Sequence, residues 1–259
     1  MGDIMKNQPR IRAVVVDLDR TLLHTDKSLS LYTETVLKKC REQGMRIMVA
    51  TARPLRTIGQ YCARIDFDAL VVSNGARVIC ADRRAEYGIC PESAERLLRV
   101  LSCRPELRVT LETGERAYSN LPISDYETIL SDDLIGIAGA EGVLKILVHM
   151  DGAGTLEFVE KELTEDLYAT VANGYLIQIM SKSATKWNGV KAMLEIVGCS
   201  PEETAYFGDD YDDLEPIRRC GIGVAVANAI DEVRAAADDI AQSNDADGVA
   251  RFIAQRFLR

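Results

Sequence analysis

Acidic side chains gather at two places in this sequence, each directly after a run of apolar residues. Asp17 and Asp19 follow the apolar segment 11–16. The second group follows segment 204–207, and its members are Asp209, Asp210, Asp212 and Asp213. Either group alone could cap a helix N-terminus, where negative charge is favoured. Two such groups at one sheet edge would repel each other, and Mg²⁺ relieves this repulsion because it prefers oxygen ligands. The pattern therefore predicts a magnesium site.

Thr51 and Lys186 add the other groups that phosphoryl transfer needs. A phosphoryl group held by a metal requires an attacking oxygen, a cation and hydroxyl or amide donors. Asp17 could be the nucleophile, Lys186 a cationic clamp and Thr51 a hydroxyl donor. A lone lysine is usually a solvated surface residue, and a lone threonine is usually a cap or turn residue. Together with the two acidic groups, however, they indicate a site for a phosphorylated substrate.

Buried strands that alternate with helices are predicted to position these side chains. The expected strands are 11–16, 47–50, 69–72, 204–207 and 222–226, all short and rich in apolar residues. A helix is expected to begin at Leu31 after Ser30 as its N-cap and to end near Gly44, and Pro54 favours the first turn of a short helix. The fold class is therefore α/β, with a Rossmann-like parallel sheet and helices on both faces. Ligands bind beyond the carboxyl ends of such strands, so side chains at these ends are expected to meet.

The pattern changes in the middle of the chain. A hairpin is expected over Val109–Tyr118, around Thr113–Gly114, and strands and helices then follow without strict alternation. The expected elements are a strand over 143–149, a helix over 156–163 and a strand over 175–180. Alternation resumes with a helix over 187–197, and the last helix is expected over 247–257. The predicted domains are a core of residues 1–82 and 182–259 and an inserted α+β cap of residues 83–181.

The overall composition is that of a globular protein with a sizeable core. The chain has 259 residues, of which 47% are hydrophobic and 27% are charged. The formal net charge of −9 argues against a nucleic-acid partner, because DNA and RNA are bound by cationic surfaces. The two histidines, His24 and His149, are too few for a three-histidine metal site.

Cysteine usage and hydropathy predict a cytoplasmic protein. The seven cysteines are odd in number and show no Cys-x-x-Cys spacing, so we expect reduced thiols. Residues 1–10 are polar and carry no apolar signal core. The sequence has no apolar run of about 18 residues, so no membrane partner is expected.

Four motifs resemble those of the haloacid dehalogenase superfamily. Asp17–Leu22 is similar to the first motif, Val49–Pro54 to the second, Lys186 to the third and Gly208–Asp213 to the fourth. Their order and spacing agree with the family. The large insertion between the second and third motifs resembles the α+β cap of the Cof-type subfamily, also called type IIB. Further likenesses to Cof-type sequences are the segments 73–76 and 223–229.

The resemblance implies a role for each of these residues. Asp17 would attack the substrate phosphorus and form an aspartyl-phosphate, which divides one difficult step into two easier ones. Asp19 would protonate the leaving alcohol and then take a proton from the hydrolytic water. Thr51 and Lys186 would hold the phosphoryl oxygens. Mg²⁺ would be held by Asp17, the backbone carbonyl of Asp19, Asp209 and Asp213, the last as a ligand or as an anchor.

The first role of Asp19 requires a raised pKa, because an acid must begin protonated. Burial and the charge of Asp17 would raise this pKa, whereas the metal would lower it, and the sequence leaves the balance open. Two positions depart from the family. The family often has glycine in place of Arg20, and many Cof-type members have asparagine in place of Asp212. Neither change removes a residue that the chemistry requires.

Several other residues have two interpretations. Arg53 could contact a second anionic group of the substrate or form a structural ion pair. Asn74 could line the pocket or serve in a turn with Gly75. His24 is expected to be a loop residue rather than a ligand, and Trp187 is expected to pack under the sheet. Cap residues that could touch substrate are Lys145, Tyr118 and His149, and the sequence does not select among them.

The leading hypothesis is a Mg²⁺-dependent phosphatase acting on a small phosphorylated metabolite, for example a sugar phosphate. The alternatives are a phosphomutase of the same superfamily and a non-catalytic phosphate-binding regulatory module. A serine esterase and a P-loop enzyme are disfavoured, because the chain has neither Gly-x-Ser-x-Gly nor Gly-x-x-x-x-Gly-Lys. The cap is expected to close over the core and select the substrate. The substrate itself, its cap contacts and the oligomeric state are beyond the sequence.

Overall fold

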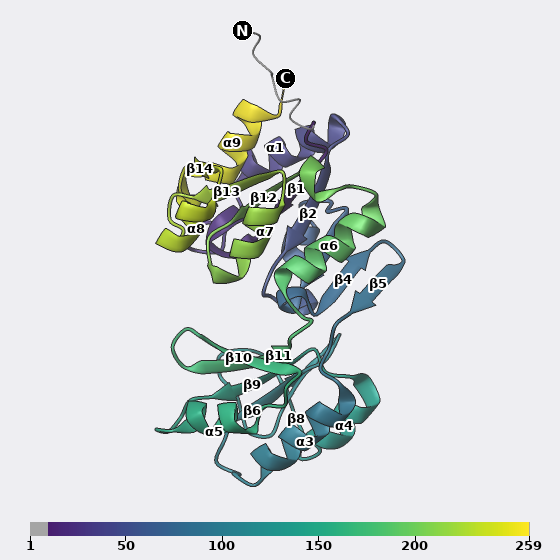
Figure 1. Cartoon of the computed structure of the whole chain (residues 1–259), viewed down its shortest axis with the longest axis vertical. Coiled ribbons are helices and arrows are strands. Elements are labelled where there is room, and N and C mark those ends of the chain that lie inside the picture. The colour runs from purple at the N-terminus through teal and green to yellow at the C-terminus, as the bar shows by residue number, and fades with distance from the viewer. Residues whose placement is uncertain (1–9, 259) are drawn as a thin grey trace.

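The computed structural model describes residues 10–258, and these form two units, each built on one β-sheet (Figure 1). The larger sheet has eight strands in the order β14-β13-β12-β1-β2-β3-β4-β5. Its strands are β1 (Ala13–Val16), β2 (Arg46–Ala50), β3 (Ala69–Val72), β4 (Arg77–Cys80), β5 (Arg83–Glu86), β12 (Thr204–Gly208), β13 (Ile222–Val226) and β14 (Asp239–Ala241). Most of the polar segment 1–10, which was expected to lack a signal core, lies outside the described residues.

The parallel part of this sheet confirms the predicted α/β class. The central strand β1 pairs in parallel with β12 and β2, and β3, β13 and β14 continue in the same direction. Strand β1 is buried along its whole length, as a strand covered on both faces must be. Strands β4 and β5 are antiparallel additions at one edge. They were not predicted, because β5 (Arg-Arg-Ala-Glu) is mostly exposed and carries no apolar signal.

Helices cover both faces of the larger sheet, as predicted. They are α1 (Leu31–Glu42), α2 (Gly59–Cys62), α6 (Lys186–Val197), α7 (Leu214–Arg219), α8 (Asp231–Ala236) and α9 (Gly248–Arg256). Helix α1 packs with α9 on one face, and α6 packs with α7 on the other (Figure 1). The expected cap of α1 is confirmed, because Ser30 Oγ accepts the backbone N–H of Thr33 at 3.0 Å. Gly44, with φ +83°, follows its end.

The smaller sheet has six strands in the order β10-β11-β9-β6-β7-β8. They are β6 (Val109–Glu112), β7 (Ala117–Ser119), β8 (Ile129–Leu130), β9 (Lys145–His149), β10 (Leu167–Ala172) and β11 (Leu176–Ser181). Helices α3 (Pro91–Ser102), α4 (Leu134–Glu141) and α5 (Thr155–Glu162) lie on the side of this sheet that faces away from the larger sheet (Figure 1). Strands β6 and β7 form the predicted hairpin. Side chains alternate along β9, so Ile146 and Val148 enter the core of the smaller unit while Lys145 reaches the larger sheet.

The chain crosses between the two units twice. The larger sheet extends past the predicted boundary at residue 82, because β5 pairs with β4. The return crossing runs through residues 182–185 into α6. All seven cysteines lie in the described part of the chain, and all are free thiols, as expected. Between residues 10 and 258, no helix has the length and apolarity needed to cross a membrane.

Candidate active site

The predicted site residues meet at the carboxyl ends of the parallel strands. Asp17 follows β1, Thr51 follows β2 and Asp209 follows β12, and these three strands are neighbours in the sheet. Lys186 is the first residue of α6, which begins beside them. Carboxylate oxygens of Asp17, Asp209 and Asp213 lie within 4.8 Å of one another. The parallel topology thus brings together acidic groups that are far apart in the sequence.

Lys186 is the buried cation of this cluster. Its Nζ lies 2.8 Å from Asp17 Oδ1, 2.7 Å from Asp213 Oδ1 and 3.2 Å from Asp212 Oδ1. Burial favours a lower lysine pKa, but these carboxylates outweigh it and raise the pKa of Lys186 well above its ordinary value. Burial and the neighbouring carboxylates also raise the pKa of Asp17 well above its usual range, against the opposing effect of Lys186. The cluster therefore carries more negative charge than its one lysine neutralises.

Asp213 is hydrogen-bonded from four directions. Its Oδ1 accepts the Tyr206 hydroxyl at 2.6 Å and Lys186 Nζ at 2.7 Å. Its Oδ2 accepts the backbone N–H groups of Asp209 at 2.9 Å and Asp210 at 3.2 Å. A carboxylate offers about four acceptor positions, so these donors occupy them. Of the two roles expected for Asp213, this arrangement favours the anchor over the metal ligand.

Asp209 supplies a second carboxylate beside Asp17. Its Oδ1 accepts the Thr21 hydroxyl at 2.9 Å. Burial, followed by the charge of Asp213, raises the pKa of Asp209 to about 6. The clustered side chains offer only oxygen donors, which is the set that suits Mg²⁺. A bound cation would stabilise the charged forms of these carboxylates, so the residues present fit the expected metal.

Asp19 has different electrostatic surroundings from Asp17. Arg53 binds it with two hydrogen bonds, Nε to Oδ2 at 2.6 Å and Nη2 to Oδ1 at 2.7 Å, and Lys27 Nζ lies 2.6 Å from Oδ1. Burial alone would raise the pKa of Asp19, but the hydrogen bonds and charges of these two cations lower it. The raised pKa that a general acid needs is therefore not found in this conformation. Arg53, for which two roles were open, here forms the ion pair.

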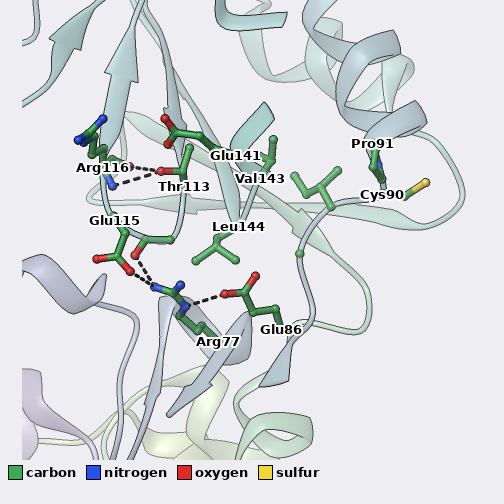
Figure 2. A pocket seen from close by; sticks show the side chains of 14 residues that line it. Arg77, Glu86, Cys90, Pro91, Thr113, Glu115, Arg116, Glu141, Val143 and Leu144 are labelled. Atoms are coloured by element: carbon green, nitrogen blue, oxygen red, sulfur yellow. Dashed lines mark hydrogen bonds and ion pairs between the residues drawn. The ribbon is translucent and has the colours of Figure 1, made fainter. Parts of the chain in front are cut away.

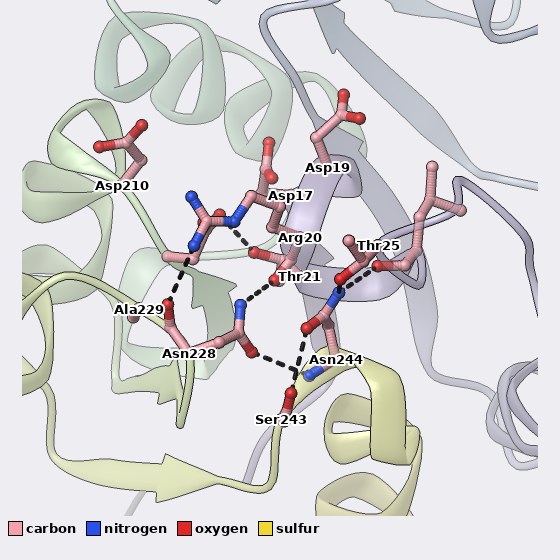
Figure 3. A network of polar contacts seen from close by, with 12 residues as sticks. Asp17, Asp19, Arg20, Thr21, Thr25, Asp210, Asn228, Ala229, Ser243 and Asn244 are labelled. Carbon is pink, nitrogen blue, oxygen red and sulfur yellow. Dashed lines mark hydrogen bonds and ion pairs between the residues drawn. The ribbon is translucent and has the colours of Figure 1, made fainter. Parts of the chain in front are cut away.

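Arg20 occupies the position where the family often has glycine. Its φ of +58° lies in the left-handed region, which glycine adopts without strain. Asn228 Nδ2 donates to the Arg20 carbonyl at 2.7 Å, and the Asn244 N–H donates to Asn228 Oδ1 at 2.9 Å (Figure 3). Arg20 Nε also lies 3.8 Å from Asp209 Oδ2. This network braces the turn after Asp17. Its asparagines were not predicted as site residues, although Asn228 lies in a segment that resembles Cof-type sequences.

A chain of hydrogen bonds connects the acidic cluster to the smaller sheet. Asp212, which contacts Lys186, accepts Asn74 Nδ2 on its Oδ2 at 3.1 Å. Asn74 Oδ1 in turn accepts Lys145 Nζ at 2.7 Å. Asn74 therefore lines the site as well as turning the chain, with φ +58°. Of the three cap candidates, Lys145 reaches this position; its sequence signal was a lysine at the start of an apolar strand.

Three further residues singled out in the sequence, Thr51, His24 and Trp187, lie outside the ion pairs of Lys186. Thr51 is buried, and its hydroxyl oxygen accepts the backbone N–H of Arg53 at 3.2 Å. His24 Nε2 lies 3.1 Å from Asp247 Oδ1, which agrees with the role of a loop residue. Trp187 is buried in the larger core, as expected.

A cavity of 570 Å³ lies away from the acidic cluster, where β4 and β5 approach the smaller sheet (Figure 2). Its buried Arg77 donates to Glu86 at 2.7 Å, to the Gly114 carbonyl at 2.5 Å and to Glu115 at 3.0 Å. A Cβ at Gly114 would lie 2.5 Å from Nη2 of this guanidinium, so the arginine side chain would have to shift if Gly114 were replaced. The guanidinium is occupied by these acceptors, and Arg77 joins the two units structurally.

Known proteins resemble this chain over nearly its whole length. The model of the haloacid dehalogenase-like hydrolase family matches residues 14–253. A phosphoglycolate phosphatase of Methanothermobacter thermautotrophicus is 28% identical over 252 residues, which cover 96% of this chain and 99% of the relative. A 5-amino-6-(5-phospho-D-ribitylamino)uracil phosphatase of Bacillus subtilis is 24% identical, with 98% and 99% covered.

Solved structures share the fold. A haloacid dehalogenase-like hydrolase from Bacteroides thetaiotaomicron superposes with a TM-score of 0.86 at 26% identity, over 96% of this chain and 100% of that one. The same arrangement of core and second unit therefore occurs in a solved member of the matched family. Because the family match extends over far more than half of the sequence, the chain belongs to the haloacid dehalogenase-like hydrolases, in the Cof-type subfamily that its motifs indicated.

Proposed function

We propose that this phosphatase hydrolyses a small phosphorylated metabolite, with Asp17 as the nucleophile and Mg²⁺ as the cofactor. One observation carries the proposal: Asp17 is buried 2.8 Å from Lys186, and its oxygens lie within 4.8 Å of those of Asp209. Burying several carboxylates around one lysine is costly for folding. Such an arrangement at the carboxyl ends of parallel strands is typical of a catalytic site.

The proposed reaction has two steps. In the first, a carboxylate oxygen of Asp17 bonds to the substrate phosphorus, and the bond from phosphorus to the ester oxygen breaks. Asp19 gives its proton to that oxygen, so the alcohol leaves neutral. In the second, Asp19 takes a proton from water, the water oxygen attacks phosphorus, and Asp17 leaves as a carboxylate with release of inorganic phosphate. Lys186 and Thr51 bind the phosphoryl oxygens throughout.

The metal would be held by Asp17, Asp209 and the backbone carbonyl of Asp19. Asp213 would support this set from behind, because it binds the backbone of the turn that carries Asp209. When bound, Mg²⁺ supplies positive charge that stabilises the negative charge on the phosphoryl oxygens.

Asp19 must leave its ion pairs before it can act as an acid. Bound to Arg53 and Lys27, its pKa is lowered, so it is deprotonated near neutral pH. An anionic group of the substrate would compete with Asp19 for Arg53 and so remove one of the two cations that lower its pKa. Arg53 thus remains a candidate substrate contact, together with Asn74 beside the cluster.

The relatives support a class of substrate rather than one compound. The two curated relatives are named for different phosphate esters, phosphoglycolate and a phosphoribitylamino-uracil. Both are small phosphorylated metabolites, and sugar phosphates belong to the same class. Small phosphate esters of this kind are therefore the proposed substrates.

Hydrolysis of p-nitrophenyl phosphate tests the proposal. We expect turnover with added Mg²⁺, loss of turnover with a chelator, and no turnover in Asp17→Asn. Asp239→Asn is the matched control, because Asp239 is exposed on the edge strand β14. Full activity of Asp17→Asn would refute the assignment of Asp17 as the nucleophile. With a metabolite substrate, loss of substrate without an equal release of phosphate would instead favour a phosphomutase, and binding without turnover across a broad panel would favour a regulatory module.

A further inference from the structure

Lys145 is a buried cation whose hydrogen-bond partners are all neutral. Its side chain is only 3% exposed. The Nζ donates to Asn74 Oδ1 at 2.7 Å, to Gln178 Oε1 at 2.8 Å and to the backbone carbonyl of Ala52 at 3.4 Å. Among residues 10–258, no carboxylate lies within ion-pair distance of this ammonium group.

The neighbouring carboxylates are bound by other cations. Glu112 lies opposite Lys145 in the β6–β9 register, but its Oε1 is bound by Arg56 at 2.7 Å. Asp212 is bound by Lys186. Burial lowers the pKa of Lys145, and the more distant charges of Glu112 and Asp212 oppose this effect. A buried charge without an opposite charge beside it is costly, and such a cost is typical of a binding site.

The position of Lys145 limits what it could bind. Its acceptor Ala52 directly follows Thr51, and its acceptor Asn74 contacts Asp212, which contacts Lys186. The ammonium group is therefore close to both residues proposed to hold the phosphoryl group. The single positive charge of this ammonium group balances one carboxylate, whereas a second phosphate monoester would bring close to two negative charges.

We propose that Lys145 binds a carboxylate of the substrate, and that the substrate is a short phosphorylated carboxylic acid. This inference rests on the proposed phosphatase function and names its substrate class. The phosphoryl group would bind at the larger sheet and the carboxylate at the smaller one. Lys145 would then select substrates from the opposite side of the site.

The test compares acids with neutral analogues of similar shape. The first pair is 2-phosphoglycolate and 2-phosphoglycolamide, and the second is 3-phosphoglycerate and glycerol 3-phosphate. We expect wild-type kcat/KM to favour at least one acid by about 30-fold or more, as for a desolvated charge pair. Lys145→Met should bring this ratio close to one, and Lys145→Arg, which keeps the charge, should retain a preference. Lys161→Met, on the exposed surface of α5, is the control that should leave the ratio unchanged.

The outcomes separate this inference from the phosphatase proposal. Wild-type turnover of p-nitrophenyl phosphate with acid-to-amide and acid-to-alcohol ratios near one would overturn the role of Lys145 and leave the phosphatase standing. Equal losses on acid and neutral analogue in Lys145→Met would also overturn it, because they indicate a structural role. Absence of all turnover in the wild type would count against the phosphatase itself. Should Lys145→Met fail to fold, the ratio of kcat/KM on the acid to kcat/KM on its neutral analogue can be measured in Lys145→Gln, which also lacks the charge.

Discussion

Two buried lysines lie on the two facing units of this protein and have opposite surroundings. Lys186, at the start of α6 in the larger unit, contacts three carboxylates. Lys145, at the start of β9 in the smaller unit, contacts three neutral oxygens. Burial alone would lower both pKa values, yet the pKa of Lys186 is raised and that of Lys145 is lowered. The charged groups around each lysine therefore decide the direction in which its pKa shifts.

This difference separates two tasks. The larger unit has an excess of negative charge around Lys186, which suits a metal cofactor and a fixed phosphoryl-transfer chemistry. The smaller unit presents a positive charge that no residue between 10 and 258 neutralises within ion-pair distance, which suits the variable part of a substrate. Hydrogen bonds from Lys145 to Asn74 and from Asn74 to Asp212 connect the two regions.

Lys186→Met is expected to have the largest combined effect on activity and stability. Activity on p-nitrophenyl phosphate should fall by about 10²- to 10³-fold or more, because a cation that stabilises the phosphoryl oxygens is lost. The free energy of unfolding should fall by about 3–5 kcal/mol, because three carboxylates lose their buried partner. Lys145→Met should cost only about 1–3 kcal/mol, since it leaves neutral acceptors unpaired. Urea unfolding at neutral pH measures the free energy of unfolding of both variants. Equal losses of stability would contradict the proposed difference between the two lysines.

Asp19→Ala is expected to have the next largest effect. Turnover of an alkyl phosphate should fall by about 10²- to 10⁴-fold, because its poor leaving group needs a proton. The loss on p-nitrophenyl phosphate should be smaller, because nitrophenolate leaves without one. Rates on both substrates, with Asp239→Asn as the control, test this difference. An equal loss on both substrates would mean that Asp19 acts only as part of the turn in the larger unit.

Magnesium affinity is expected to depend on pH through Asp209. Its pKa is raised to about 6, so protons compete with the metal as the pH falls through this value. Affinity at about pH 5 should therefore be roughly tenfold weaker than at about pH 7.5. Titration of the protein with Mg²⁺ by calorimetry at several pH values measures this change. Asp209→Asn should reduce it, and the raised pKa of Asp17 accounts for any dependence on pH that remains. A Mg²⁺ affinity of the wild type that does not change with pH would show that Asp209 does not bind the metal.

Arg20→Gly is expected to have the smallest effect. Glycine accepts the left-handed conformation at φ +58°, and removal of this strain should stabilise the protein by up to about 1 kcal/mol. The lost charge is exposed and lies 3.8 Å from Asp209, so its contribution is small. Thermal unfolding provides the comparison. A clear destabilisation would show that the arginine side chain, rather than the backbone network with Asn228, holds the turn.

Much of the larger unit could be predicted because its signals are local. Short apolar runs marked β1, β2, β3, β12 and β13, and the cap at Ser30 marked the start of α1. The edge strand β5 was missed because an exposed strand lacks an apolar pattern, and its partly buried neighbour β4 was missed as well. In the smaller unit the hairpin around Thr113–Gly114 was predicted, but most of the order of its strands was not, because antiparallel neighbours can be joined in many ways.

The sequence by itself determined which acids follow buried strands, and parallel pairing then required Asp17 and Asp209 to meet at one edge of the sheet. Only the tertiary structure decided how each side chain is paired. It directs Asp19 to Arg53 and Lys27, surrounds Asp213 with four donors, and brings Lys145 across from the other sheet. The periodic pattern of apolar residues is a property of a short segment of sequence. The choice of partner for a polar side chain depends instead on side-chain directions and on the positions of two sheets, which no short segment encodes.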